Sequence, residues 1–180
     1  MHHTKVIALY APSGGGKTTI AGDLQSRVPN AGALYFDDRD YDAESGIGAI
    51  GEWVEEGGDV NRFQLQSLAD EIEAMQQEKR DFIFLDYPFG YRHKLIAPYI
   101  TLSVFIDTPL DIAMARRILR DYKKDTASAI LDEMESYLQG GRSAYLYGDK
   151  AARADADFIA DGSLPIAVIS RKIREKIGLI

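Results

Sequence analysis

The segment VIALYAPSGGGKTTI, residues 6–20, decides how the rest of the chain is interpreted. It begins with Val6–Tyr10, an apolar run with the length of a β-strand. A turn rich in glycine follows, and from Lys17 onward the apolar residues are spaced as on a helix. The segment therefore predicts a strand, a tight glycine-rich turn and a helix in direct succession.

The turn of this segment has the composition of a phosphate-binding loop. Glycine lets the backbone curl until successive N–H groups face one anion, and the following helix adds the partial positive charge of its N-terminus. Lys17 is then predicted to reach the β- and γ-phosphates of a nucleotide, and the Thr18 hydroxyl to bind Mg²⁺. The predicted nucleotide-binding residues of the loop are Ser13, Gly14, Gly15, Gly16, Lys17, Thr18 and Thr19.

One position of the loop departs from the full motif. The motif begins with glycine five residues before Gly16, and this chain has Ala11 there. Alanine is small enough for that position. The alternative interpretation is a glycine-rich turn before an ordinary helix that carries a surface lysine.

Length and composition narrow the class of protein. A chain of 180 residues with 46% hydrophobic residues is predicted to form one α/β domain, residues 1–180. The net charge of −7 gives no long-range attraction for nucleic acid or an anionic membrane. The absence of cysteine excludes disulfides, thiolate metal sites and cysteine nucleophiles. No apolar run approaches the ~18 residues of a membrane span, so we expect a cytoplasmic protein. The sequence leaves open whether the protein forms a homodimer. We assign no role to His2 and His3.

Strand-like and helix-like segments alternate along the chain. Apolar runs predict strands at residues 6–10, 33–36, 81–85, 101–106 and 158–160. Helical spacing predicts helices at residues 17–28, 62–79, 109–122, 126–139, 143–153 and 165–177, and residues 45–58 predict a short helix or a lid-like connection. This alternation favours an α/β fold with a parallel sheet of about five strands and helices on both faces.

The helical spacings also predict which side chains are buried. In the helix at 126–139 they are Ile130, Leu131, Met134 and Leu138, and in the last helix Ile166, Ile169, Ile173 and Ile177. The pair Gly140 and Gly141 is predicted to separate two helices.

Acidic residues stand at the ends of two predicted strands. Asp37 and Asp38 follow the strand at 33–36, and Asp86 follows the run at 81–85. Ligands of an open α/β sheet bind at the carboxyl ends of its strands. An apolar strand that ends in an acid, downstream of a phosphate loop, is the Walker B pattern. Asp86 is therefore predicted to lie in or behind the Mg²⁺ ligand shell, beside Thr18.

Together with the loop, three later stretches resemble the uridine kinase-like branch of the P-loop nucleoside and nucleotide kinases. They are residues 36–41 (FDDRDY), 104–121 (VFIDTPLDIAMARRILRD) and 156–165 (ADFIADGSLP). The resemblance covers nearly the whole chain. It implies the three-layer P-loop NTPase fold with a small arginine-bearing lid, here at about residues 111–150. It also implies ATP and Mg²⁺ as cofactors, with the adenine near Gly162 and Ser163.

Two positions depart from the pattern of that branch. A residue is inserted before Tyr41 in the acidic turn, and Ala113 stands where such kinases often carry a further arginine. Both departures concern the acceptor of the phosphoryl group.

Arginines are concentrated on the helix that the resemblance identifies with the lid. Arg116 and Arg120 are four residues apart and therefore share a helix face. We expect both to be catalytic and to stabilise the charge on a transferring phosphoryl group, and we expect Arg117 to contact the nucleotide. The alternative is a solvated basic face that pairs with Asp111 or Asp121.

Asp37 is the predicted general base, which would accept the proton of an acceptor hydroxyl. Action of Asp37 or Asp38 through the metal, or a structural turn cap, are the alternatives. The predicted acceptor-binding residues are Asp37, Asp38, Tyr41, Tyr91 and Arg92, with Trp53 and Phe89 as further planar groups. Aromatic residues at such places can equally belong to the core or its rim.

The predicted function is an ATP- and Mg²⁺-dependent kinase that transfers the γ-phosphoryl group to a hydroxyl of a nucleoside or similar small metabolite. The expected partner is that small molecule, and neither nucleic acid nor a membrane. A kinase of a sugar or another small alcohol is the second hypothesis, and a nucleotide-dependent switch without an acceptor is the third. A switch needs neither the acid after the second strand nor the lid arginines.

Overall fold

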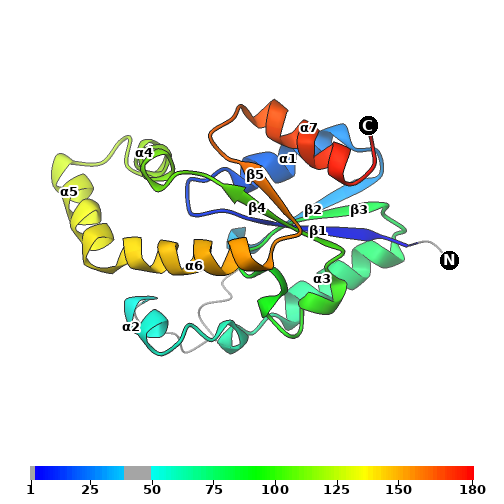
Figure 1. Ribbon diagram of the computed structural model, residues 1–180, viewed down its shortest axis with the longest axis horizontal. Coiled ribbons are helices and arrows are strands. Elements are labelled where there is room, and N and C mark those ends of the chain that lie inside the picture. The colour runs from blue at the N-terminus through cyan, green and yellow to red at the C-terminus, as the bar shows by residue number, and fades with distance from the viewer. Residues whose placement is uncertain (1–2, 39–49) are drawn as a thin grey trace.

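Five parallel strands form a single sheet (Figure 1). The computed structural model describes residues 3–38 and 50–180. The strands pair in the order β2-β3-β1-β4-β5. Their bounds are β1 Lys5–Tyr10, β2 Ala31–Tyr35, β3 Phe82–Asp86, β4 Leu102–Asp107 and β5 Phe158–Asp161. The predicted parallel sheet is confirmed.

Helices alternate with these strands, as the spacing predicts. Their bounds are α1 Lys17–Arg27, α2 Ile50–Glu55, α3 Gln66–Gln77, α4 Leu110–Asp121, α5 Ala127–Ser136, α6 Arg142–Asp155 and α7 Ile166–Lys176. The prediction for residues 45–58 lies partly outside the described residues, and its described part contains α2.

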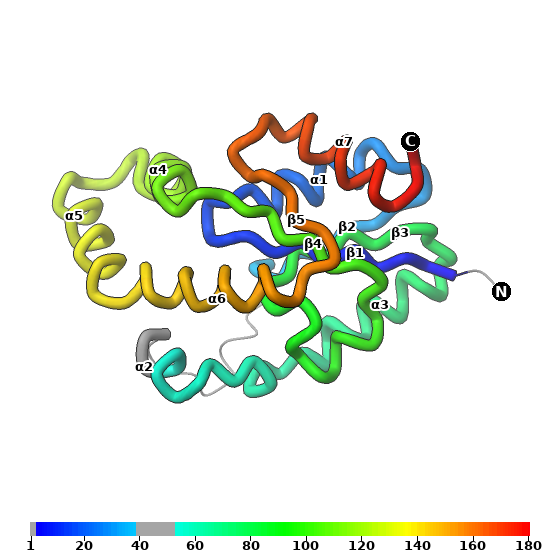
Figure 2. The backbone as a smooth tube through the Cα atoms, in the orientation of Figure 1, coloured from blue at the N-terminus to red at the C-terminus, as the bar shows by residue number. Residues whose placement is uncertain are grey.

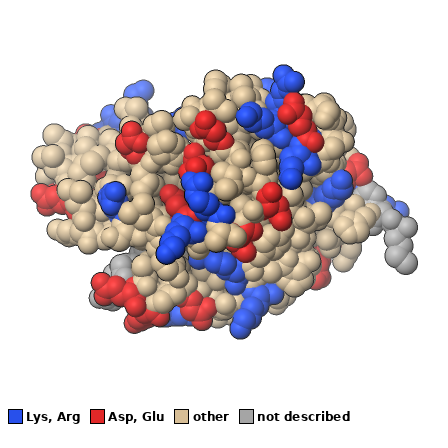
Figure 3. Space-filling model, in the orientation of Figure 1, with Lys and Arg blue, Asp and Glu red and all other residues tan. Residues whose placement is uncertain are grey.

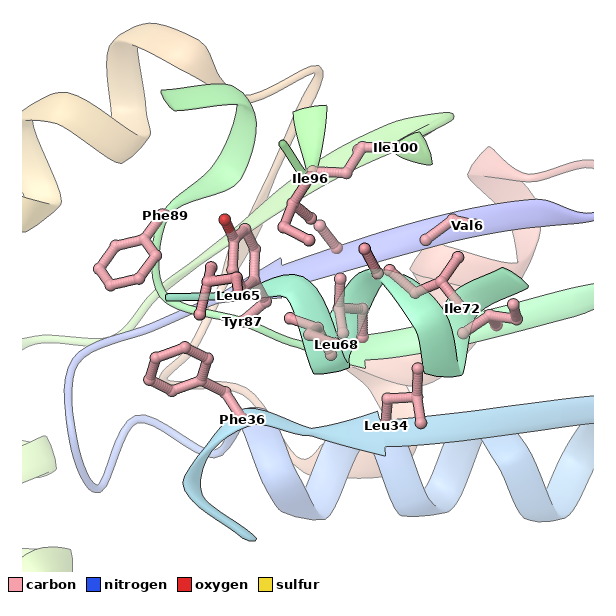
Figure 4. Close-up of a cluster of buried hydrophobic side chains, with 14 of the residues drawn as sticks. Val6, Leu34, Phe36, Leu65, Leu68, Ile72, Tyr87, Phe89, Ile96 and Ile100 are labelled. Carbon is pink, nitrogen blue, oxygen red and sulfur yellow. The ribbon is translucent and has the colours of Figure 1, made fainter. Parts of the chain in front are cut away.

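Helices cover both faces of the sheet (Figures 1 and 2). On one face Ile7 and Leu9 of β1 pack against α1 and α7, and on the other face Val6 packs with Leu68 and Ile72 of α3 (Figure 4). Successive residues of a strand point to opposite faces. A strand buried on both faces is therefore a continuous apolar run, which explains why β1 shows no alternation of polar and apolar residues.

The carboxyl ends of the three strands that precede the predicted site lie at one edge of the sheet. In the strand register, Asp86 at the end of β3 is opposite both Leu9 of β1 and Tyr35 of β2. The glycine-rich turn, Asp37 and Asp86 therefore all start from the same edge.

The helices α4, α5 and α6 form an arm beyond this edge, and α5 lies at the end of the molecule farthest from the sheet (Figure 2). The prediction that Gly140 and Gly141 separate two helices is wrong. α5 continues into α6 through a π-helical turn, Tyr137–Gly141, in which Gly141 has φ −57° and ψ −42°. Glycine adopts helical angles at a cost of only about 1 kcal/mol relative to alanine, so it need not end a helix.

Three burial predictions in the helices are also wrong. Leu131 and Leu138 are 62% and 76% exposed, because α5 and the turn after it lie away from the sheet. In α7, Ile169 and Ile173 are buried as predicted, whereas Ile166 is 39% exposed.

On the face shown in Figure 3, acidic and basic side chains lie interspersed. Within the described residues, none of the helices has the length and apolar character that crossing a bilayer requires.

Candidate active site

The turn between β1 and α1 has the backbone of an anion cradle. Gly14 and Gly16 have φ values of 82° and 102°, in the region that glycine occupies without strain. Gly16 is the N-cap of α1, and no side chain caps that helix. The first N–H groups of α1 therefore remain available to a ligand, together with the positive end of the helix dipole.

Ala11 fits the first position of the loop because residue 15 is glycine. Ala11 is 3% exposed, and a Cβ on Gly15 would lie only 2.7 Å from the Ala11 Cβ. The methyl group of Ala11 thus occupies space that Gly15 leaves open.

Lys17, Thr18 and Asp86 meet at the floor of this cradle. The Thr18 hydroxyl donates a hydrogen bond to Asp86 Oδ2 at 2.6 Å, and Lys17 Nζ lies 3.8 Å from Asp86 Oδ1. Lys17 Nζ also donates to the Ala11 carbonyl oxygen at 3.3 Å. Lys17 and Thr18 begin α1, directly after the turn that follows β1, and Asp86 ends the neighbouring strand β3, so the pairing of β1 with β3 brings the three side chains together.

Asp86 has the burial and the unpartnered oxygen expected of a carboxylate that binds a cation. It is 1% exposed, and its Oδ1 has no hydrogen-bond partner among the described residues. Burial raises the pKa of Asp86, and the ammonium of Lys17 and the hydroxyl of Thr18 partly offset this. An uncompensated carboxylate oxygen beside a hydroxyl fits Mg²⁺, which takes oxygen ligands and keeps several waters. The described residues hold no cluster of three or more His, Asp or Glu that would bind a metal without a ligand's help.

A cavity of about 470 Å³ lies above this floor. Its volume is in the range of small-molecule sites. Its walls come from the glycine-rich turn, from Asp37, from α4 and from the turn between β5 and α7. The lining residues are Pro12, Ser13, Gly14, Gly15, Gly16, Lys17, Thr18, Thr19, Ile20, Asp37, Arg116, Arg120, Gly162, Ser163, Leu164, Pro165, Ile166 and Ile169.

Asp37 and Asp38 have different surroundings. Both lie in the helical turn Phe36–Asp38 after β2, but only Asp37 lines the cavity. Asp38 lines a separate small pocket with Tyr35 and Glu71. The structure thus distinguishes the two acids. Tyr41 lies outside the described residues.

Arg116 and Arg120 share one face of α4, as their spacing predicts, and both line the cavity. Arg116 Nη1 donates to the Gly162 carbonyl oxygen at 3.4 Å. Arg120 Nη2 lies 3.5 Å from the Ser13 hydroxyl, and Arg120 also pairs with Asp121 at 2.6 Å. Part of the alternative hypothesis therefore holds, because one arginine has an acidic neighbour on its own helix.

Arg117 is not brought to the cavity. Its guanidinium pairs with Glu133 of α5 and lies 5.8 Å from the ring centre of Tyr145 on α6. Tyr122 donates to the same Glu133. Because the Arg117 side chain contacts Glu133 and Tyr145, it connects the helices of the arm, and the geometry does not support the predicted contact with a nucleotide.

The turn after β5 closes the other end of the cavity. Gly162 and Ser163 line it as expected, and apolar residues Leu164, Pro165, Ile166 and Ile169 follow. The Ser163 hydroxyl is engaged by Asp161 at 2.6 Å. Sequence spacing assigned Ile166 to the core, and its partial exposure arises because it lines the cavity instead.

The remaining predicted acceptor residues lie elsewhere. The Tyr91 hydroxyl donates to Asp157 Oδ2 at 2.6 Å, and Asp157 also accepts the N–H of Ser103 at the start of β4. Tyr91 therefore packs against the first residues of β4 and β5, and it is not among the residues that line the cavity. The Arg92 guanidinium donates to the carbonyl oxygens of Phe89 and Pro88, at 3.3 and 3.4 Å, and does not line the cavity.

Trp53 and Phe89 belong to an aromatic cluster beside the core. Phe36, Phe63, Tyr87 and Phe89 stack edge to face or tilted with ring centres 4.6–6.1 Å apart, and Trp53 packs on Phe63 at 6.1 Å. Figure 4 shows Phe36, Tyr87 and Phe89 turned toward one another. The core alternative is therefore correct for Phe89, which is 6% exposed.

No protein-family model and no curated protein matches the sequence. The fold, however, is similar to solved structures. A shikimate kinase from Bacteroides thetaiotaomicron has a TM-score of 0.58 at 18% identity, with 96% of this chain and 98% of that chain covered. A shikimate kinase from Acinetobacter baumannii in complex with shikimate has a TM-score of 0.56 at 17% identity, covering 98% and 94%. A sugar kinase from Janibacter sp. HTCC2649 has a TM-score of 0.62 at 15% identity, covering 98% and 96%.

These likenesses extend over whole chains and establish the fold. The protein has the three-layer fold of P-loop kinases. At identities below 20% they do not establish the substrate.

Proposed function

We propose that the protein is an ATP- and Mg²⁺-dependent kinase that transfers the γ-phosphoryl group to a hydroxyl of a small metabolite. The observation that carries the proposal is the shared cavity. The glycine-rich turn, the Lys17–Thr18–Asp86 group, the acid Asp37 and two arginines of α4 all meet there.

ATP fits the cavity with its phosphates on the loop and its base at the opposite end. The loop amides and Lys17 bind the β- and γ-phosphates. The turn at Gly162 and Ser163, with its apolar neighbours, receives the base. Thr18 and Asp86 hold Mg²⁺, which neutralises phosphate charge when bound.

Asp37 acts as the general base in this proposal. Its carboxylate accepts the proton of the acceptor hydroxyl while the hydroxyl oxygen bonds to the γ-phosphorus, and the bond from that phosphorus to the β–γ bridging oxygen breaks, so that ADP leaves. Arg116 and Arg120 line the same cavity and stabilise the charge on the equatorial oxygens of the transferring group. The protein thus supplies position and charge, which is most of what phosphoryl transfer requires.

The class of acceptor is the finer part of the proposal. The acidic turn after β2 favours a nucleoside, as in the uridine kinase-like branch. The departure at Ala113 and the location of Tyr91 away from the cavity weaken that choice. A sugar or a hydroxy acid is the second candidate, because the similar folds include a sugar kinase and a kinase crystallised with shikimate.

A nucleotide switch would not use the acid and the arginines. Asp37 lines the cavity, and so do Arg116 and Arg120. A switch explains neither arrangement, and this favours a catalytic role.

The test is turnover of ATP and Mg²⁺ against a panel of nucleosides, sugars and hydroxy acids, with products identified by mass spectrometry. We expect one class of acceptor to gain 80 Da, the mass of a phosphoryl group added in place of a proton. Lys17→Ala is the matched control, which should fold and lose transfer by orders of magnitude. Equal turnover by folded Lys17→Ala, or tight ATP binding without transfer to any acceptor class, would contradict the proposal.

A further inference from the structure

Thr108 follows β4 and contacts the phosphate loop from outside the cavity. Its side chain is 2% exposed, and Oγ1 donates a hydrogen bond to the Gly15 carbonyl oxygen at 2.9 Å. The two residues are separated by 93 positions in the sequence. Thr108 is absent from the cavity lining, whereas Gly15 and Gly16 belong to it.

This hydrogen bond fixes the peptide group between Gly15 and Gly16. A trans peptide group is planar, and its C=O and N–H point in opposite directions. The described peptide bonds are all trans. Because Thr108 holds the Gly15 carbonyl toward the protein interior, the N–H of Gly16 is directed to the cavity side.

A glycine loop needs such a restraint. Gly14 and Gly16 flank the peptide at positive φ, and glycine passes between backbone regions at little steric cost. No residue of the described chain accepts a hydrogen bond from the Gly16 N–H, so nothing on the cavity side holds it. The Thr108 hydroxyl therefore supplies the orientation that the glycines themselves leave free.

The same side chain packs against the turn at the other end of the cavity. The Gly162 N–H donates to the Asp107 carbonyl oxygen at 2.9 Å. A Cβ on Gly162 would lie 1.9 Å from Thr108 Oγ1, so only glycine allows this approach. Thr108 thus touches the phosphate loop and the turn that carries Ser163.

We propose that Thr108 is a positioning residue for nucleotide binding. Its hydroxyl holds the Gly16 N–H toward the phosphates. Its packing on Gly162 keeps the phosphate loop in a fixed position relative to the turn that receives the base. This inference rests on the proposed function for the identity of the anion as a nucleotide phosphate.

Thr108→Val tests the hydroxyl, because valine keeps the shape against Gly162 and removes the donor. The affinities for ATP, ADP, inorganic tripolyphosphate and adenosine are measured by calorimetry, together with kcat and KM. We expect phosphate-bearing ligands to bind about tenfold more weakly or worse, the effect of losing one hydrogen bond to a charged group. Adenosine binding should be unchanged, and KM for ATP should rise.

Thr4→Val is the matched control. Thr4 is also buried, and its hydroxyl donates to a backbone carbonyl oxygen, that of Arg80, at 2.6 Å, but at the amino edge of the sheet. A generic loss of stability would appear in both variants, whereas the loss of phosphate affinity should appear only in Thr108→Val. Equal ligand affinities in the two variants would overturn the inference.

A second pair keeps the test decisive if Thr108→Val does not fold. Thr108→Ser and Thr108→Ala differ only by the hydroxyl group, and we expect the serine variant to retain phosphate affinity and the alanine variant to lose it. Equal affinities of this pair would reject the role of Thr108 while wild-type turnover still supports the kinase. If the wild type binds ATP but phosphorylates no acceptor, the kinase proposal fails and the binding data still decide the role of Thr108. If it binds neither ATP nor tripolyphosphate, both fail.

Discussion

The buried carboxylate of Asp86 is unfavourable for folding and, for the same reason, suited to binding a cation. Burial of a charged group is unfavourable unless it is paired, and one oxygen of Asp86 has no partner among the described residues. The nearest cation is Lys17 Nζ, at 3.8 Å, which is long for a direct ion pair. The raised pKa of Asp86 reflects this incomplete compensation. A bound cation would remove the cost, because it favours the ionised form.

We therefore predict that Asp86→Asn removes the effect of Mg²⁺ on ATP binding. Asparagine still accepts the Thr18 hydroxyl, but it removes a negative charge near the phosphates. Affinity for ATP in EDTA should stay equal or rise, and addition of Mg²⁺ should no longer strengthen it. In the wild type, Mg²⁺ affinity should fall as the pH falls through the raised pKa of Asp86, because protonation competes with the metal. Calorimetric titration across pH measures both effects, and an unchanged Mg²⁺ effect in the variant would exclude Asp86 from the metal site.

Asp37 and Asp38, the two acids after β2, provide a second prediction about single residues. Asp37→Asn should leave ATP·Mg²⁺ affinity nearly unchanged and lower transfer by about 10²-fold or more, the usual scale of general-base catalysis. Asp38→Asn is its control, since Asp38 lines a different pocket and should keep wild-type turnover. Steady-state kinetics on the true acceptor decides the matter. Turnover of Asp37→Asn within a factor of about three of wild type would remove it from the mechanism, and a drop in Mg²⁺ affinity would assign it to the metal.

At the scale of elements, the contact between α4 and the phosphate loop determines where the arginines lie. A Cβ on Gly14 would lie 2.1 Å from the Ala113 carbonyl oxygen and 3.1 Å from the Arg117 nitrogen. The backbone of α4 therefore rests directly on the loop. This approach fixes the face of α4 that carries Arg116 and Arg120 toward the cavity, and it buries Ala113, which is 2% exposed.

Gly14→Ala should consequently separate the two elements. The added methyl group meets a backbone carbonyl, and alanine at φ 82° is strained. Positive φ costs about 1–2 kcal/mol and overpacking about 1–3 kcal/mol, so we expect a loss of several kcal/mol in urea unfolding together with lower ATP affinity. Gly140→Ala is the control, because nothing lies within 4 Å of its added Cβ and the residue is helical. That variant should be unchanged or more stable by up to about 1 kcal/mol, and equal losses in both would contradict the contact.

Local sequence patterns were sufficient to predict most helices and strands and the residues at the floor of the cavity, Lys17, Thr18 and Asp86. Apolar runs identified the strands because a sheet covered on both faces leaves no alternation. The loop motif identified Lys17 and Thr18, and the acid at the end of the apolar run at 81–85 identified Asp86. Pattern also showed that Arg116 and Arg120 share a face, but not which face meets the cavity, so Arg117 was assigned to the nucleotide. Tyr91 and Arg92 were predicted to bind the acceptor but do not line the cavity, because the path of a loop after a strand depends on tertiary contacts. No sequence pattern indicated a role for Thr108, because the residue that its hydroxyl contacts, Gly15, is remote in the sequence.

At the scale of the whole molecule, α6 joins the arm to the sheet. Gly148 of α6 approaches β1 so closely that a Cβ there would lie 2.4 Å from the Tyr10 hydroxyl oxygen. The Tyr10 hydroxyl donates to Asp149 Oδ1 at 3.3 Å, and Arg153 pairs with Asp107 at the end of β4. At the other side of α6, Tyr147 donates to the Gly57 carbonyl oxygen at 2.9 Å, just after α2. The arm is thus held between the sheet and the segment that follows α2.

The charge on Asp149 makes this junction sensitive to pH. Burial raises the pKa of Asp149 to about 6, while the Tyr10 hydroxyl lowers it, Asp107 raises it and Arg153 lowers it. The unfolded value is about 3.9. Between these values the native state binds more protons than the unfolded state, so stability falls as the pH rises from about 4 to 6. Above about 6 the native state carries the full cost of a half-buried carboxylate.

We therefore predict that Asp149→Asn raises Tm at pH 8 and that its advantage disappears as the pH falls toward 4. Asparagine still accepts the Tyr10 hydroxyl and has no charge to bury, so the variant loses the proton linkage and keeps the contact. Asp59→Asn is the control of opposite sign, since hydrogen bonds from Asn61 lower the pKa of Asp59 and its charge is favourable in the native state. Thermal unfolding from pH 4 to 8 should show a Tm difference for Asp149→Asn that grows with pH, and none or a small loss for Asp59→Asn. A difference for Asp149→Asn that does not change with pH would mean that Asp149 does not titrate at the junction between α6 and β1.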